Sequence, residues 1–281
     1  NYRKAVMNDD IAWSIIAVPS AKWAAKVFPD LPENEQVNAL WDAIFKTVRI
    51  GEGNAVEAWH EHVTNLEKRA AQLNAKRYKA LHYKAPGTDL TIELPEKHLW
   101  LTGGSKTPQG TTFIANMPTE EVYTMPAKYG VEGTVSNTKP LVYKGNVIDQ
   151  FTLTFEKGKI VKAHAQVGND LLQQLITTDE GSSYLGEVAL VPHQSPISAS
   201  NILYYNTLFD ENASNHLAIG EAYPTCYEGG RELKQGQLES LGINTSITHE
   251  DFMIGSSEMD IDGELADGTL EPIFRKGNWA F

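Results

Sequence analysis

The sequence is poor in cysteine, in long apolar runs and in basic residues. Cys226 is the single cysteine among 281 residues, so an intrachain disulfide and a multi-cysteine zinc site are both excluded. This cysteine usage fits a reducing compartment. If the chain binds a metal ion, the ligands are therefore His, Asp and Glu side chains.

The shortage of basic residues and of long apolar runs disfavours two classes of partner. The chain has 24 basic residues against 36 acidic ones, and its net charge of −12 is spread along the sequence. A nucleic-acid-binding protein needs a basic face. No apolar run approaches the roughly 20 residues that span a membrane, and the longest, residues 11–18, has the length of a strand. We therefore expect no nucleic-acid partner and no membrane partner.

Hydrophobic spacing predicts that the first part of the chain is helical after a buried strand at residues 13–18. The predicted helices run from residue 20 to 28, from about 31 to 50, and from 55 to about 81. His60 and His62 would lie about 200° apart on the last of these helices. They cannot share a metal ion there, and we expect both at the surface.

From residue 82 onward apolar and polar residues alternate and turn residues recur, which indicates β-structure. Strands are predicted at residues 88–94, 98–102, 131–135, 141–143, 147–156, 159–166 and 186–191. The sequence therefore predicts an α+β fold. Its helix-rich part, residues 1–81, packs on a largely antiparallel or mixed β-rich part, residues 82–281.

Two histidine-bearing segments have the character of metal sites. His216 follows an acidic turn in a small, mostly uncharged segment. Residues 247–254 are rich in β-formers, and in a strand His249 and Asp251 would project to the same face. An imidazole beside a carboxylate suits a borderline cation such as zinc, cobalt or manganese. Alone, this pattern is more typical of a solvated strand end, so further ligands have to be found.

Carboxylates set in apolar strands are the natural further ligands, because an unpaired charge there is costly. Glu187 lies in one such strand, and Glu120 and Glu121 lie in another. Neighbouring residues of a strand face opposite ways, so only one of the pair enters a given site, and the sequence leaves open which. Two carboxylates, a His-x-Asp pair and His216 exceed the needs of one zinc ion and suit two ions that share a water.

Four segments, in the same order, resemble the aminopeptidase T, aminopeptidase S and PepS family of dinuclear metallopeptidases. They are residues 116–124, 186–192, 206–216 and 249–256, and the likeness continues through residues 271–281. By this resemblance the metal ligands are Glu121, Glu187, His216, His249 and Asp251. Tyr223 matches an active-site tyrosine of the family.

The resemblance implies a metal-dependent aminopeptidase that removes N-terminal residues from peptides through a water bridged by two divalent ions, zinc, cobalt or manganese. In this interpretation Glu120 carries the proton to the leaving amine, and Tyr223 stabilises the oxyanion. It also implies a cytoplasmic homodimer. Family members have an additional N-terminal α/β domain with no counterpart here, so residues 1–281 are expected to form the catalytic domain alone.

Two other classes of function stay open. A mononuclear zinc amidohydrolase, such as a deacetylase, would use His249, Asp251 and one more histidine, and would leave Glu121 and Glu187 as structural charges. A non-catalytic peptide-binding domain would keep the cleft without holding metal tightly. The number of metal ions per chain and the hydrolysis of an aminoacyl anilide distinguish these alternatives.

Overall fold

The β-rich part forms two large antiparallel sheets and a small strand pair, in a computed structural model that describes residues 5–6, 9–51 and 53–281. The larger sheet consists of β1 (Ala80–Ala85), β2 (Thr88–Glu93), β7 (Val131–Ser136), β8 (Leu141–Tyr143), β9 (Asn146–Glu156), β10 (Lys159–Val167), β14 (Asp260–Glu264), β15 (Leu270–Arg275) and β16 (Asn278–Trp279). The smaller sheet consists of β3 (Leu101–Thr102), β6 (Val122–Thr124), β11 (Leu185–Leu190), β12 (His216–Gly220) and β13 (His249–Met253). The strand pair is formed by β4 (Gly104–Lys106) and β5 (Thr112–Ile114).

Strand order places the two sheets around one apolar core. The larger sheet has the order β10-β9-β7-β2-β1-β14-β15-β16, with β8 paired to β9, and the smaller one has the order β13-β12-β11-β6-β3. Side chains of both sheets, among them Tyr83, Phe155, Leu217 and Phe252, belong to a single hydrophobic cluster. The predicted α+β fold is confirmed.

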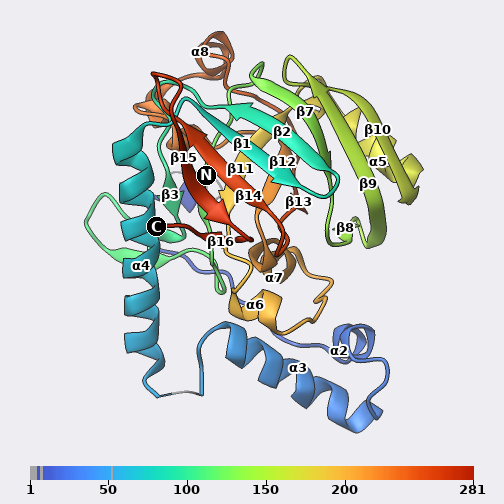
Figure 1. Cartoon of the computed structure of the whole chain (residues 1–281). Helices are drawn as coiled ribbons and strands as arrows, with labels where there is room; N and C mark the ends of the chain where they lie inside the picture. Colours follow the sequence, from blue (N-terminus) through green and yellow to red (C-terminus); the bar gives the residue numbers. More distant parts are fainter. Residues whose placement is uncertain (1–4, 7–8, 52) are drawn as a thin grey trace.

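The helices surround these sheets. They are α2 (Ala21–Val27), α3 (Glu33–Thr47), α4 (Ala55–Lys76), α5 (Asn169–Ile176), α6 (Pro196–Ala199), α7 (Thr207–Asp210) and α8 (Gln235–Ser240), with 3₁₀ turns η1 (Gly181–Ser183), η2 (Glu211–Ala213), η3 (Pro224–Cys226) and η4 (Gly230–Glu232). Figure 1 shows α4 along one side of the molecule, and α6 and α7 between the sheets and α3. A second apolar cluster, which includes Leu40, Trp59, Tyr204 and Phe209, joins α2, α3 and α4 to this region.

Local capping explains where the first helices begin and end. The Ser20 hydroxyl accepts a hydrogen bond from Trp23 N at 3.2 Å, and the Asn54 side chain accepts one from Val56 N at 3.1 Å. Helix α4 ends at Lys76, rather than near residue 81, because Arg77 adopts a left-handed conformation with φ of 51°. The chain reverses there, and the last apolar residues of the predicted helix belong to β1 instead.

The buried strand predicted at residues 13–18 is wrong. Ile15 makes only an isolated bridge to Asn116, and the side chains of Ile15 and Ile16 are 51% and 65% exposed. The segment lies extended on the surface, where Ile15 N donates to Ala115 O at 2.7 Å. Its apolar run therefore does not mark a core strand. Among the described residues, no helix combines the length and the apolar character needed to cross a membrane.

Candidate active site

The register of the smaller sheet brings His249, Asp251 and Glu187 to one face. Asp251 on β13 is paired with Ala218 on β12, and Ala218 is paired with Glu187 on β11. Directly paired residues of an antiparallel sheet share a face, and so do alternate residues of one strand. His249, two residues before Asp251, therefore lies on this face too. The small Ala218 side chain leaves the space between the two carboxylates open.

The same face carries His216 and Glu121. His216, the first residue of β12, is paired with Ala189, and Ala189 is paired with Tyr123 on β6. Glu121 precedes Tyr123 by two residues and so shares its face, whereas Glu120 does not. This pairing distinguishes the two neighbouring glutamates, which the sequence alone could not do. All five residues predicted as ligands come together here: four lie on the neighbouring strands β11, β12 and β13, and Glu121 directly precedes β6.

Glu187 lies at the centre of two groups of possible ligand atoms. One group consists of Glu121, Glu187 and His216 and the other of Glu187, His249 and Asp251, and within each group the atoms lie within 4.8 Å of one another. Glu187 Oε1 is 3.8 Å from His216 Nε2, and Glu187 Oε2 is 3.6 Å from His249 Nε2. The two oxygens of this one carboxylate therefore face different groups.

Backbone carbonyls aim both imidazoles into the site. His216 Nδ1 lies 3.0 Å from Ser214 O, and His249 Nδ1 lies 2.7 Å from Glu221 O. A carbonyl oxygen only accepts, so Nδ1 carries the proton in each ring. In the neutral imidazole this leaves the Nε2 lone pair for a metal ion. His216 Nε2 is 3.1 Å from Glu121 Oε2, and His249 Nε2 is 3.7 Å from Asp251 Oδ1.

The side chains present fit divalent cations. Burial raises the pKa of the Glu187 carboxyl well above its usual range, and the charges of Asp251 and Glu121 raise it further. Burial alone would lower the pKa of His216, but its hydrogen bond to Glu121 and that residue's charge more than offset this, so the pKa is raised. Asp251 Oδ1 is buried and has no hydrogen-bond partner in the described part of the chain. Such concentrated and incompletely paired negative charge is stabilised by a bound cation.

Tyr223, which precedes η3, lies against His249. The centroids of the two rings are 4.7 Å apart. Burial, followed by the charges of Glu187, Asp251 and Glu121, raises the pKa of the Tyr223 phenol far above neutrality. The hydroxyl therefore stays protonated and can donate a hydrogen bond to an oxyanion.

The Glu120 side chain lies on the opposite side of the backbone from the five proposed ligands. Its carboxylate forms an ion pair with the Arg49 guanidinium, with Nη1 2.7 Å from Oε1, and Nη2 also donates to Oε2 at 3.0 Å. His62 lies beside this ion pair, with Nε2 2.7 Å from Thr119 O and Nδ1 3.0 Å from Arg49 Nη2. The prediction of a surface position is thus wrong for His62, because the α3–α4 turn brings Arg49 over it.

Glu211 is a further acidic residue of the site that the sequence reasoning did not single out. Burial raises its pKa well above the usual range, and the charges of Asp251, Glu121 and Glu187 add to this effect. It opens η2, five residues before His216, and the side chain of Asn212 donates to it at 3.3 Å. The available signal was an acidic pair, Asp210 and Glu211, in a segment otherwise rich in small and apolar residues.

Comparison with known proteins agrees with this site. The profile of the thermophilic metalloprotease family M29 matches residues 1–279. Aminopeptidase AmpS of Bacillus subtilis strain 168 is 58% identical over 280 residues, which cover 100% of this chain and 68% of that protein. Aminopeptidase 2 of Geobacillus stearothermophilus is 53% identical over 281 residues, covering 100% of this chain and 68% of its own length.

The same relationship holds in three dimensions. Wild-type AmpT from Thermus thermophilus superimposes with a TM-score of 0.91 at 42% identity, over 99% of this chain and 67% of that one. The resemblance first indicated by four sequence segments is therefore confirmed along nearly the whole chain. This protein belongs to the thermophilic metalloprotease family M29.

Proposed function

We propose that the protein is a metal-dependent aminopeptidase in which two divalent ions, zinc, cobalt or manganese, are held at the described face of the smaller sheet. The proposed ligands are Glu121, Glu187, His216, His249 and Asp251. The observation that carries the proposal is the position of Glu187, whose two oxygens lie 3.8 Å from His216 Nε2 and 3.6 Å from His249 Nε2. A carboxylate placed in this way suits a pair of ions better than a single one.

The chemistry is divided between the ions and the chain. When bound, the ions would supply Lewis acidity toward water and the scissile carbonyl. Tyr223 donates its phenolic hydrogen to the developing oxyanion. The sequence assigned proton transfer to the leaving amine to Glu120, but its carboxylate lies away from the face of the proposed ligands and is paired with Arg49, so this role stays a prediction. Glu211 is a second candidate for this role, because its charge interacts with those of Asp251, Glu121 and Glu187.

Substrate class, assembly and location rest on family membership. The relatives are named aminopeptidases, and we propose that this chain likewise acts on peptides with a free N-terminus. We also propose, on the same basis, that it is a cytoplasmic homodimer and that residues 1–281 act as one catalytic domain.

Hydrolysis of a leucyl anilide, measured together with metal content, tests the proposal. We expect cleavage of the free-amine substrate but not of its N-acetylated form, loss of activity with a chelator, and two ions per active chain. His216→Ala should lose both metal and activity, whereas His164→Ala, on the exposed surface of β10, should keep both. One ion per fully active chain would favour the mononuclear hydrolase, and metal-independent activity of His216→Ala would refute the ligand assignment.

Glu120→Gln and Glu211→Gln distinguish the two proton-transfer candidates. The variant that loses general acid–base catalysis should lose about 100-fold or more in kcat while it retains its metal ions. A loss confined to Glu211→Gln would move the role from Glu120 to Glu211. Equal, near-normal kcat values in both variants would exclude both residues.

A further inference from the structure

The orientation of the His249 imidazole depends on a backbone carbonyl outside the face that carries the proposed ligands. His249 Nδ1 donates to Glu221 O at 2.7 Å, and Glu221 follows the last residue of β12. A ligand imidazole is oriented by the group that its other nitrogen meets. Any displacement of the backbone at Glu221 would therefore turn the Nε2 lone pair of His249 away from Glu187 and Asp251.

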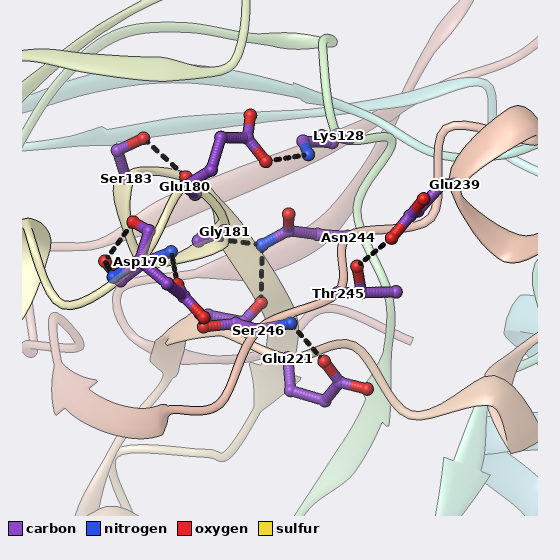
Figure 2. Close-up of polar contacts among 12 residues, drawn as sticks. Lys128, Asp179, Glu180, Gly181, Ser183, Glu221, Glu239, Asn244, Thr245 and Ser246 are labelled. Atoms are coloured by element: carbon purple, nitrogen blue, oxygen red, sulfur yellow. Dashed lines mark hydrogen bonds and ion pairs between the residues drawn. The ribbon is translucent and has the colours of Figure 1, made fainter. Parts of the chain in front are cut away.

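Asn244 is hydrogen-bonded to the backbone on both sides of Glu221, and Figure 2 shows its side-chain nitrogen also bonded to Gly181. Its side-chain nitrogen donates to Gly220 O at 2.6 Å and to Gly181 O at 2.8 Å, so both hydrogens of the amide are used. The backbone carbonyl of Asn244 accepts a hydrogen bond from Ala222 N at 3.0 Å. Asn244 is fully buried and thereby brackets Glu221 from both sides.

Asp179 fixes the loop that carries Asn244 (Figure 2). Its carboxylate accepts hydrogen bonds from Ser246 Oγ at 2.8 Å, from Ile247 N at 2.7 Å and from Ser182 N at 2.8 Å. Glu221 completes the arrangement, because its side chain accepts a hydrogen bond from Ser246 N and its own N donates to Thr248 O at 2.7 Å. The loop from residue 243 to 248 leads directly into His249.

Close backbone contacts leave this arrangement little freedom. A Cβ on Gly186 would lie 2.2 Å from Glu221 O and 2.3 Å from Gly220 O, so only glycine fits beside the carbonyl that His249 uses. Gly186 directly precedes Glu187. The same contact therefore fixes the carbonyl against the strand that supplies the central carboxylate.

We infer that Asn244 and Asp179 are positioning residues for His249, and that they act by holding the Glu221 carbonyl at which the imidazole is aimed. The inference rests on the proposed metal-dependent function. Its specific consequence is asymmetric, because the Glu221 carbonyl orients His249, which belongs to the group of Glu187, His249 and Asp251 and not to the group of Glu121, Glu187 and His216. Weakening the arrangement should affect one of the two metal ions more than the other.

Metal titration of Asn244→Ala tests the inference directly. The binding of cobalt to chelator-treated protein is followed by the visible absorption spectrum and by competition with a chelator of known affinity. We expect one binding step to weaken about tenfold or more, as when a hydrogen-bond partner of a metal ligand is removed. The other step should stay within about twofold, and the spectrum of the weakened ion should change.

Asn74→Ala is the matched control, because the Asn74 amide also makes two backbone hydrogen bonds, to Trp100 O at 2.9 Å and from Trp100 N at 2.8 Å, away from His249. It should leave both binding steps unchanged. Asp179→Asn, at a half-buried position, gives a second test that does not depend on the folding of Asn244→Ala. It should reproduce the one-sided weakening to a smaller extent.

The possible failures are distinguishable. If both variants bind both ions as tightly as the parent, or weaken both steps equally, Asn244 and Asp179 have only a structural role and the inference is overturned. If the parent protein itself binds no cobalt and hydrolyses no anilide, the proposed function fails instead.

Discussion

At the scale of single residues, buried negative charge dominates the chemistry of this protein. Glu121 and Glu187 are buried and face one another across His216, and Asp251 adds a third carboxylate. Against these acids the candidate site offers only two imidazoles. Burying such charge is unfavourable without a cation. The site is therefore maintained for binding rather than for stability.

Tyr223→Phe should lower kcat by tenfold or more and leave metal content unchanged. The phenol stays protonated at neutral pH, and removing one donor to an oxyanion typically costs this much or more. The ring contact with His249 is kept by phenylalanine, so the metal ligands should not shift. Steady-state kinetics and metal analysis on the same samples check the prediction. A near-normal kcat would remove Tyr223 from the mechanism.

Asp210→Asn should make the stability of the protein less dependent on pH. Burial raises the pKa of Asp210 from its usual 3.8 to about 6, although backbone N–H groups of Tyr204 and Asn206 oppose the shift. Between these two values the folded chain keeps a proton that the unfolded chain has released. The contribution of Asp210 to the free energy of unfolding is therefore fully present below pH 3.8 and is lost as the pH rises through about 6.

The size of this effect follows from the shift. A change from 3.8 to about 6 corresponds to about 3 kcal/mol. Relative to the parent, Asp210→Asn should gain about this amount of unfolding free energy between pH 4 and pH 7. Urea denaturation of chelator-treated parent and variant across this range provides the measurement. A constant difference between them would contradict the raised pKa.

At the scale of elements, the helical part has a core of its own. Leu40 on α3 is 0% exposed and belongs to the cluster with Trp59 and Phe209, separate from the core between the sheets. Leu40→Ala should lower the free energy of unfolding by about 3 kcal/mol, through lost burial and the cavity left behind. Leu31→Ala, at a side chain 36% exposed, should cost much less.

The same pair of variants shows how far the helices support the site. Because no predicted metal ligand belongs to the second apolar cluster, Leu40→Ala should bind metal as tightly as the parent at a temperature where both are folded. Denaturant unfolding and metal titration together check this. Loss of metal affinity in the folded variant would show that the α3 region sets the geometry of the sheet face.

Elements with strong local signals were predictable from the sequence. The Ser20 cap predicted the start of α2, and the apolar spacing from residue 55 predicted the start of α4, where the structure shows Asn54 as the cap. The apolar run at residues 13–18 led to a wrong prediction of a buried strand, because apolar character alone does not determine burial. Ile16 in this run is 65% exposed. A helix end set by one left-handed residue, Arg77, was likewise invisible in the spacing.

The candidate site was predictable in composition but not in arrangement. Residue types and motifs indicated the five proposed ligands, and the alternation of His249 and Asp251 gave their common face correctly. The choice between Glu120 and Glu121 needed the pairing of Tyr123 with Ala189, which is a long-range property. Glu211 was missed for the same reason, since its relation to Asp251 arises only when distant segments meet.

At the scale of the whole molecule, metal removal should cost activity and some stability but not the fold. The described residues form three apolar clusters that hold the sheets and helices together, and none of them contains a predicted ligand. An ion present at about 100 times its Kd adds about 2.7 kcal/mol to the free energy of unfolding. For a chain of this size that corresponds to a fall in Tm of about 5 °C for each ion that a chelator removes.

Calorimetry, far-ultraviolet circular dichroism and anilide hydrolysis of one chelator-treated preparation check this prediction. We expect unchanged secondary structure, a lower Tm and no activity, with zinc, cobalt or manganese restoring both Tm and hydrolysis. Activity and Tm should return because backbone pairing, and not the ions, holds the strands that carry the proposed ligands in register. Examples of this pairing are His216 with Met253 and Ala189 with Tyr123. Unfolding on chelation would mean that the ions, and not the sheet register, bring the ligand strands together.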